Sequence, residues 1–273
     1  MPELPEIETI CRGLAAQLPG RTLAGVRVRQ RQLRLPVDVE ALQQAVGCRI
    51  ERVGRRGKYV LVFLQPPRVL IFHLGMSGRL RVGPPQANDA RHDHLIFALG
   101  ADLELRFYDP RRFGLCFLTT PESLPHHPCL RHLGPEPLSE AFSAAYLAER
   151  GRGRRCPLKA FLLDATVVAG IGNIYASEIL FAARLSPTRE AGSLSLPEWE
   201  RLRAAVQQVL VEAIAHHGTS IADYVDSRGQ PGRFQNRLRV YGREGEPCPR
   251  DGQSIRRLVQ AGRSTYYCPR CQR

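Results

Sequence analysis

The first residues of the chain place a potential nucleophile next to two carboxylates. The sequence begins Met1-Pro2-Glu3-Leu4-Pro5-Glu6. Removal of the initiator methionine, which a proline in second position allows, would leave a secondary amine on Pro2. Such an amine can attack an aldehydic carbon to form an iminium ion, an electron sink used in covalent catalysis, and Glu3 or Glu6 could move protons beside it. Proline and glutamate are also common in the first turn of a helix, which requires no catalysis.

The other end of the chain carries the donors of a metal site. Cys248-Pro-Arg-Asp251 is followed, after sixteen residues, by Cys268-Pro-Arg-Cys271. Two Cys-x2-Cys pairs with such a gap are typical of a zinc ribbon, but Asp251 stands where the second cysteine belongs. Three thiolates and a carboxylate can still bind zinc, so we predict one structural Zn²⁺ at these four residues. The alternative is a metal-free hairpin with three free thiols.

The charge of the chain indicates the kind of molecule that it binds. Its 39 basic and 26 acidic residues give a formal net charge of +13, and Lys58 and Lys159 are the only lysines. Genome composition can produce such an arginine bias, but the excess charge favours a polyanion such as nucleic acid. Arginine stays protonated whereas lysine can lose its proton, which makes the two lysines of interest.

Several classes of protein are excluded by composition. No apolar run approaches the ~18 residues of a membrane span, and the first residues lack the basic and apolar stretches of a secretory signal. Eight cysteines in 273 residues are too dilute for a disulfide scaffold. The sequence therefore predicts a soluble intracellular protein with no membrane partner.

Hydrophobic spacing divides the chain into a β-rich and a helical part. Apolar residues at helical spacing predict a helix over 6–18, and the short apolar runs that follow predict antiparallel strands over 26–28, 58–64, 69–74, 94–99 and 103–108. Helical periodicity then recurs over 139–150, 157–164, 173–184 and 197–217, before a polar loop and the cysteine-bearing tail. We predict an α+β protein whose domains span 1–132, 133–235 and 236–273.

The helical part contains two segments suited to phosphate. Residues 150–155 form a basic, glycine-rich link that includes Arg154, and Gly170-Ile-Gly-Asn173 precedes a predicted helix. A glycine-rich turn at a helix start presents backbone N–H groups to an anion, and Asn173 adds a side-chain donor. Basic links are also common as solvated loops.

Seven motifs in order give the chain a family resemblance. They occupy residues 2–6, 57–59, 73–78, 109–114, 133–138, 170–178 and 240–243, and with the cysteine tail they extend from residue 2 to residue 271. In these motifs the chain resembles the bacterial formamidopyrimidine-DNA glycosylases, which repair 8-oxoguanine. The related endonuclease VIII branch typically has glycine in place of Leu4 and lacks the motif around Met76, so the resemblance favours oxidised purines.

The resemblance implies a fold and a set of catalytic roles. The fold would be a β-sandwich with an N-terminal helix, a helix–two-turns–helix module and a zinc-ribbon hairpin, with DNA in the cleft between two lobes. Pro2 would attack the sugar C1′ to form a Schiff base, and Glu3 would protonate the ring oxygen. Lys58 would donate a proton and contact phosphate, Glu6 would anchor the N-terminal helix, and Arg263 would grip a phosphate and assist elimination.

The resemblance also implies residues that open the duplex. A base inside a duplex cannot be reached, so the lesion must be flipped out and its space filled. Met76 and Phe113 would enter the stack as apolar wedges, and Arg111 would hydrogen-bond the widowed cytosine. A sandwich core is the competing location for Met76 and Phe113, but both stand in Gly- and Arg-flanked turns.

Further DNA contacts follow from the same resemblance. His92 matches a DNA-contacting histidine, although a surface-loop histidine would look the same. By the same resemblance, residues 219–236 would cover the flipped base. Independently of it, Arg154 and Lys159 lie on the basic approach to the Gly170–Asn173 turn, and with Asn173 they would contact phosphate.

These inferences converge on one activity. We predict a monomeric bacterial enzyme, cytoplasmic and nucleoid-associated, that acts on double-stranded DNA containing oxidised purines or abasic sites. It would be a bifunctional DNA glycosylase and abasic-site lyase that removes 8-oxoguanine and formamidopyrimidines and cuts the strand by β- and δ-elimination. The reaction needs no diffusible cofactor. The alternatives are an endonuclease VIII-like glycosylase for oxidised pyrimidines and a non-catalytic protein that binds damaged DNA.

Overall fold

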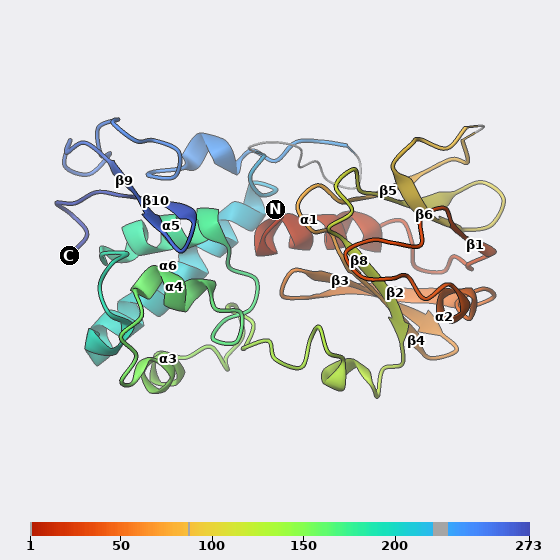
Figure 1. Cartoon of the computed structure of the whole chain (residues 1–273), viewed down its shortest axis with the longest axis horizontal. Helices are drawn as coiled ribbons and strands as arrows, with labels where there is room; N and C mark the ends of the chain where they lie inside the picture. The colour runs from red at the N-terminus through yellow and green to blue at the C-terminus, as the bar shows by residue number, and fades with distance from the viewer. Residues whose placement is uncertain (1, 87, 221–228) are drawn as a thin grey trace. The chain divides into compact units, whose positions relative to one another are not determined.

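The computed structural model describes residues 2–86, 88–220 and 229–273, which separate into two compact units. The first unit comprises the chain up to Arg131 together with His217–Arg233, and the second comprises His132–His216 and Phe234–Arg273. Antiparallel sheets make up most of the first unit, whereas helices and one β-hairpin make up the second (Figure 1). The predicted α+β class is confirmed.

The N-terminal helix α1 (Leu4–Ala15) begins two residues before the predicted start and ends three before the predicted end. Its start is fixed by a capping box, in which the Glu3 side chain accepts the backbone N–H of Glu6 and the Glu6 side chain accepts that of Glu3. Such reciprocal bonds satisfy N–H groups that a helix end leaves unpaired. The apolar residues of α1 are buried, and α1 packs against strands β2 and β3.

Two antiparallel four-stranded sheets form the predicted sandwich. The first sheet has the order β2 (Arg49–Arg56), β3 (Tyr59–Gln65), β4 (Arg68–His73), β8 (Leu115–Thr119). The second has the order β1 (Gly25–Val28), β6 (Asp93–Ala98), β7 (Glu104–Tyr108), β5 (Arg79–Gly83). Their inner faces meet in one core, where the Phe72 ring lies 5.6 Å from that of Phe97 and 6.0 Å from that of Phe107. A short helix α2 (Val39–Gln43) and a 3₁₀ turn (Leu124–His126) complete the unit.

The second unit is built around four helices, α3 (Ala144–Gly151), α4 (Leu158–Leu163), α5 (Asn173–Ala183) and α6 (Leu196–Ala215). All four overlap the predicted helices. The apolar stripe of α6 is buried as its spacing predicts, and α5 is buried on nearly every side. A 3₁₀ turn (Ala191–Ser193) lies between α5 and α6. A second 3₁₀ turn (Phe234–Arg237) and the antiparallel hairpin β9 (Arg256–Gln260)–β10 (Arg263–Tyr267) follow α6. In the described residues, no helix has the length and apolarity needed to cross a membrane.

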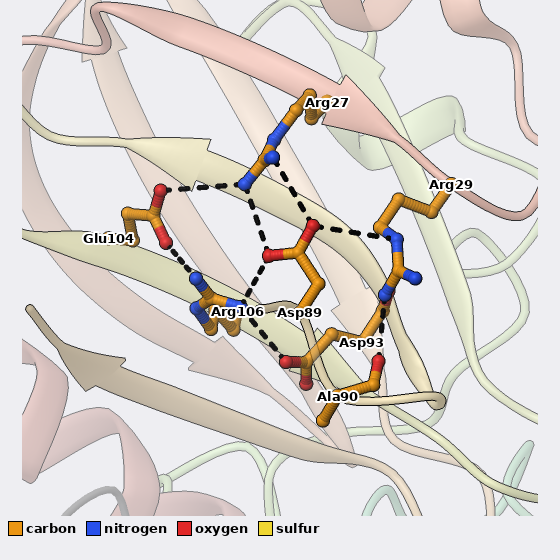
Figure 2. A network of polar contacts seen from close by, with 7 residues as sticks. All are labelled: Arg27, Arg29, Asp89, Ala90, Asp93, Glu104 and Arg106. Carbon is orange, nitrogen blue, oxygen red and sulfur yellow. Dashed lines mark hydrogen bonds and ion pairs between the residues drawn. The ribbon is translucent and has the colours of Figure 1, made fainter. Parts of the chain in front are cut away.

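An ion-pair network fixes the segment before β6 to the second sheet. It joins three carboxylates and three guanidinium groups: Asp89, Asp93, Glu104, Arg27, Arg29 and Arg106 (Figure 2). The Arg106 side chain is only 5% exposed, and it lies 2.9 Å from Asp89 and 3.0 Å from Asp93. Arg29 also donates to the backbone carbonyls of Ala90 and Asp93. Residues 89–93 are therefore held at both ends, with His92 between them.

Candidate active site and metal centre

Pro2 and its neighbouring carboxylates are buried at the start of α1. Glu3 is 3% exposed and Glu6 is 2% exposed. Glu6 accepts the backbone N–H of Glu3 at 2.8 Å and that of Thr219 at 2.6 Å. Gly218 has φ +76°, and a Cβ there would lie 2.6 Å from Glu6 Oε1, so only glycine fits. These bonds support the predicted role of Glu6 in anchoring the N-terminal helix.

Lys58 stands in the tight turn between β2 and β3. Arg56 pairs with Tyr59, which leaves Gly57 and Lys58 as the two turn residues, and Gly57 supplies the positive φ, +54°, that such hairpins favour. The strands of this hairpin, β2 and β3, pack on α1, the helix that Pro2 precedes. Lys58 is half-buried.

His73, at the end of β4, is a titratable group whose pKa is strongly affected by its surroundings. Burial, and then the positive charges of Lys58 and Arg34, lower the pKa of His73 from 6.5 to about 4. The imidazole is therefore neutral at pH 7, and its Nδ1 accepts the backbone N–H of Gly75 at 3.1 Å. This bond connects the end of β4 to the turn that carries Met76.

The side chains predicted to fill the space of a flipped base project from two turns in contact. Met76 is 46% exposed and Phe113 is 43% exposed, so the alternative location in the sandwich core is wrong. The guanidinium of Arg111 lies 4.8 Å from the Phe113 ring centroid. Gly75 has φ +58°, and a Cβ there would lie 2.5 Å from the Phe113 carbonyl carbon. Glycine thus lets the two turns touch backbone to backbone.

His92 lies on the segment just before β6, and its backbone carbonyl accepts the N–H of Asp109. Its ring centroid is 5.8 Å from that of Tyr108 and 6.2 Å from that of His94. The side chain is half-buried, on the segment that the Arg106 network holds in place (Figure 2).

The second unit contains the remaining predicted contacts. Lys159 is only 1% exposed, and its ammonium group donates to the Ser264 carbonyl and the Thr265 hydroxyl, each at 2.8 Å. These bonds support strand β10, in which Ser264 directly follows the exposed residue Arg263. A phosphate contact by Lys159 stays a prediction.

Asn173 and Arg154 are more accessible than Lys159. Asn173 begins α5, and its side-chain amide donates to the same Ser264 carbonyl at 3.0 Å. Arg154 is half-exposed and pairs with Asp164 at 3.2 Å. The loop predicted to cover a flipped base, residues 219–236, includes residues 221–228, which lie outside the described residues, as does Met1.

The four predicted metal ligands come together below the hairpin. One donor atom from each of Cys248, Asp251, Cys268 and Cys271 lies within 4.8 Å of all the others. The Cys248 and Cys271 sulfurs are 3.9 Å apart, and Asp251 Oδ1 is 3.4 Å from the Cys268 sulfur. Zn–S bonds of about 2.3 Å in a tetrahedron place sulfurs about 3.8 Å apart, so these donors fit one zinc ion.

The local backbone and the thiol chemistry agree with a cation at this place. The N–H of Arg250 donates to the Cys248 sulfur and that of Cys271 to the Cys268 sulfur, as in metal-binding knuckles. Burial and the neighbouring sulfurs raise the pKa of Cys271 to about 12. A bound divalent cation would reverse this preference by stabilising the thiolates.

Comparison with known proteins gives a match to three consecutive domain families. Residues 1–116 match the formamidopyrimidine-DNA glycosylase N-terminal domain, residues 133–225 the H2TH domain of the same enzymes, and residues 245–273 a zinc finger found in these glycosylases and in isoleucyl-tRNA synthetase. A curated formamidopyrimidine-DNA glycosylase from Acidithiobacillus ferrooxidans is 49% identical over the full length of both chains. The chain belongs to the formamidopyrimidine-DNA glycosylase family.

Solved structures of relatives contain damaged DNA. A point mutant of the Lactococcus lactis family member, in complex with DNA containing Fapy-dG, matches with a TM-score of 0.92 and 34% identity over all of both chains. The wild-type L. lactis glycosylase in complex with DNA containing an oxidised pyrimidine matches with a TM-score of 0.91 and 33% identity, also over all of both chains. The zinc-finger match includes all four residues of the metal cluster.

The structure of the present chain also shows a buried carboxylate for which the sequence predicted no role. Glu178 on α5 is 3% exposed and accepts the backbone N–H groups of Arg239, Val240 and Tyr241 at 2.8–3.0 Å. Burial raises its pKa, against the effect of these hydrogen bonds. Glu178 thus fixes the turn that carries Tyr241. Its position in an otherwise apolar helix was the available signal, since a buried carboxylate needs donors.

Proposed function

We propose that this glycosylase is bifunctional, removing oxidised purines from duplex DNA and then cutting the strand at the abasic site. The observation that carries the proposal is the placement of Pro2. It is buried at the start of α1 beside Glu3, and the hairpin carrying Lys58 packs on the same helix. Loss of the single residue Met1 would give Pro2 a secondary amine, and its adduct with C1′ is an iminium ion that carries its positive charge without added protonation.

The reaction follows from the chemistry of a secondary amine. The Pro2 nitrogen attacks C1′ of the damaged nucleotide and gives up its own proton as the glycosidic C–N bond breaks, and the departing base takes up a proton in exchange. Protonation of the ring oxygen by Glu3 opens the sugar and leaves an iminium ion between Pro2 and C1′. This electron sink acidifies the C2′ hydrogens, so a base removes one of them and the 3′ phosphate leaves; a second elimination expels the 5′ phosphate.

Two further groups assist at defined points in this scheme. Lys58 supplies a proton and a positive charge at the lesion phosphate, and Arg263 binds a phosphate and assists its departure. The three cysteines and Asp251 would hold a zinc ion, which would stabilise the hairpin and take no part in catalysis.

Access to the base depends on the exposed turns of the first unit. Met76 and Phe113 enter the space that the flipped nucleotide leaves, and Arg111 hydrogen-bonds the base opposite. His92, Arg154 and Asn173 contact the DNA backbone. The half-exposed state of Met76 and Phe113 supports this role, because large apolar side chains are seldom left in water without a function when they cluster.

A second candidate function concerns oxidised pyrimidines. It is favoured by the L. lactis relative whose structure contains an oxidised pyrimidine in DNA. Leu4 and the Met76 turn favour purines in this chain. Single-turnover excision of 8-oxoguanine and of thymine glycol from matched duplexes decides between them, and faster removal of thymine glycol would reverse the assignment.

We also propose that the chain has three domains, over 1–132, 133–235 and 236–273. The protein is proposed to be a monomer that acts on the DNA of the bacterial nucleoid. The proposal as a whole is tested by a nicking assay on duplexes with an abasic site. A protein that binds damaged DNA without nicking it would be the non-catalytic alternative.

A further inference from the structure

We propose that Asp109 is a positioning residue that fixes the side chains of Met76, Arg111 and Phe113 relative to one another. The inference rests on the proposed function of Met76, Arg111 and Phe113, and it assigns the control of their placement to one buried carboxylate. Asp109 directly follows strand β7 and is 0% exposed.

Asp109 connects three segments that are far apart in sequence. Its Oδ1 accepts the Ser77 hydroxyl at 2.8 Å, and its Oδ2 accepts the backbone N–H of Gly114 at 2.7 Å. Ser77 immediately follows Met76, and Gly114 immediately follows Phe113. The backbone N–H of Asp109 donates to the His92 carbonyl at 3.0 Å. Asp109 is therefore hydrogen-bonded to a residue in, or directly beside, each turn that is proposed to contact the opened duplex.

The Asp109 carbonyl oxygen adds two more bonds within this region. It lies 2.7 Å from His94 Nε2 and accepts the backbone N–H of Arg112 at 3.2 Å. Arg112 has φ +56°, a left-handed conformation that persists in a non-glycine residue only where its surroundings fix it. Arg112 separates Arg111 from Phe113, so this turn determines where both side chains point.

The packing around Asp109 leaves little freedom for compensation. A Cβ on Gly114 would lie 2.4 Å from the Phe107 ring and 3.0 Å from Asp109 Oδ2. The Gly114 N–H and the Ser77 hydroxyl are thus enclosed donors, and a carboxylate can accept both at once. Loss of the carboxylate would leave at least one donor buried without a partner, which is costly.

The exposure of the wedge side chains makes this backbone support necessary. Met76 and Phe113 are close to half exposed, so packing around their side chains cannot hold them in one position. Their orientation must come from the turns beneath them, and Asp109 is the residue that ties those turns together. A carboxylate that served only the stability of the sandwich would affect all substrates alike.

The test compares variants of the carboxylate with a matched control on the same unit. Asp109→Ala removes both side-chain bonds, whereas Asp109→Asn keeps an acceptor for Gly114 and can donate to the Ser77 hydroxyl. Ser77→Ala removes one bond only. Asp102→Ala makes the same change at an exposed aspartate, with 69% of its side chain accessible, that pairs with Arg21.

The readout is single-turnover excision of 8-oxoguanine opposite each of two bases, cytosine and adenine, together with the thermal midpoint. We expect Asp109→Ala to slow excision about thirtyfold and to reduce the discrimination between opposite bases, because the Arg111 turn is displaced. Asp109→Asn should stay within about fivefold of wild type and Ser77→Ala within about tenfold. Asp102→Ala should match wild type.

A double-mutant cycle separates positioning from simple stabilisation. In a Met76→Ala, Phe113→Ala background, adding Ser77→Ala or Asp109→Asn should slow excision by less than about twofold more, because the side chains that Asp109 positions are already absent. Fully additive effects, or losses that track the thermal midpoint alone, would overturn the inference. If Asp109→Ala does not fold, the same double-mutant cycle with Ser77→Ala and Asp109→Asn still tests the inference. Absence of excision and nicking by the wild-type protein is a separate result, which would contradict the proposed function itself.

Discussion

The N-terminal site and the metal centre hold their functional groups in different ways. Pro2, Glu3 and Glu6 lie at the start of a helix that packs against a sandwich, and the two sheets of this sandwich share one extensive apolar core. The hairpin beside the metal cluster has a core of only five buried residues, two of which are the ligands Cys248 and Cys268. The first region is therefore positioned by burial and backbone hydrogen bonds, whereas the second depends on what its ligands bind.

We expect this difference to separate attack at C1′, which depends on the N-terminal site, from the phosphate contact that Arg263 is proposed to make. Changes at the N-terminal site should alter reaction steps without unfolding the sandwich. Loss of metal should loosen the hairpin that carries Arg263 and leave the first unit intact.

The largest effect is expected for Glu3→Gln. The substitution removes a proton donor and no positive charge, so base excision should fall by about 10²–10⁴ while binding to lesion DNA is retained. Single-turnover excision and a parallel binding titration measure the two quantities. Glu51, an exposed carboxylate on β2, gives the matched control Glu51→Gln, which should behave as wild type. Equal excision by Glu3→Gln and wild type would remove Glu3 from the mechanism.

Metal removal should affect the second unit selectively. Carboxylate is a harder ligand than thiolate, so chelators should extract zinc more readily from this site than from one with four thiolates. Asp251→Cys should slow zinc release by about tenfold or more, and Asp251→Ala should release the ion. Zinc content measures loss of the ion, DNA affinity measures the effect on the hairpin, and amide exchange in the sandwich shows whether the first unit stays folded. Zinc-free protein with full DNA affinity would mean that packing alone orders the hairpin.

Acid should destabilise the first unit through His73. Its pKa is about 4 in the folded protein and near 6.5 when unfolded, so between these values the unfolded state binds more protons. The free energy of unfolding should therefore fall as pH drops from about 6.5 to about 4, by up to about 3 kcal/mol from this group. His73→Gln cannot gain the proton and should flatten this part of the profile, measured by denaturant unfolding at a series of pH values. An unchanged profile would show that His73 does not contribute.

The smallest effect is expected at the opposite base. Arg111→Ala should reduce the preference for cytosine opposite the lesion by about 1–3 kcal/mol if the contact is bidentate. The comparison uses binding to duplexes that differ only in that base. Arg81, an exposed residue of β5, provides a control with the same loss of charge. A matching loss of preference in Arg81→Ala would make the effect electrostatic rather than specific.

Local patterns predicted the parts of the structure that depend on nearby residues. An apolar stripe predicted a helix over 197–217, close to the observed α6, and the cysteine spacing predicted all four members of the metal cluster, including Asp251. Strand β2 was missed because it is rich in arginine and lacks an apolar run. The Arg52 guanidinium nevertheless lies 3.4 Å from the centroid of the Phe63 ring and so packs against it.

Long-range polar partners could not be found in this way. Lys159 was predicted to contact phosphate from its place on a basic stretch, and no sequence pattern indicated its partners Ser264 and Thr265, more than a hundred residues further along the chain. Asp109 likewise binds Ser77, 32 residues before it. No spacing rule links such residues, because tertiary structure alone brings them together.

The identity of the nucleophile is tested most directly by borohydride trapping on an 8-oxoguanine duplex, followed by peptide mapping of the cross-link. With Met1 attached the Pro2 nitrogen is an amide and cannot attack, so only protein that starts at Pro2 should react. We expect a single cross-linked N-terminal peptide carrying the DNA on Pro2, and no cross-link in protein that retains Met1. A cross-link on Lys58, or equal trapping by Met1-bearing protein, would contradict the proposed mechanism.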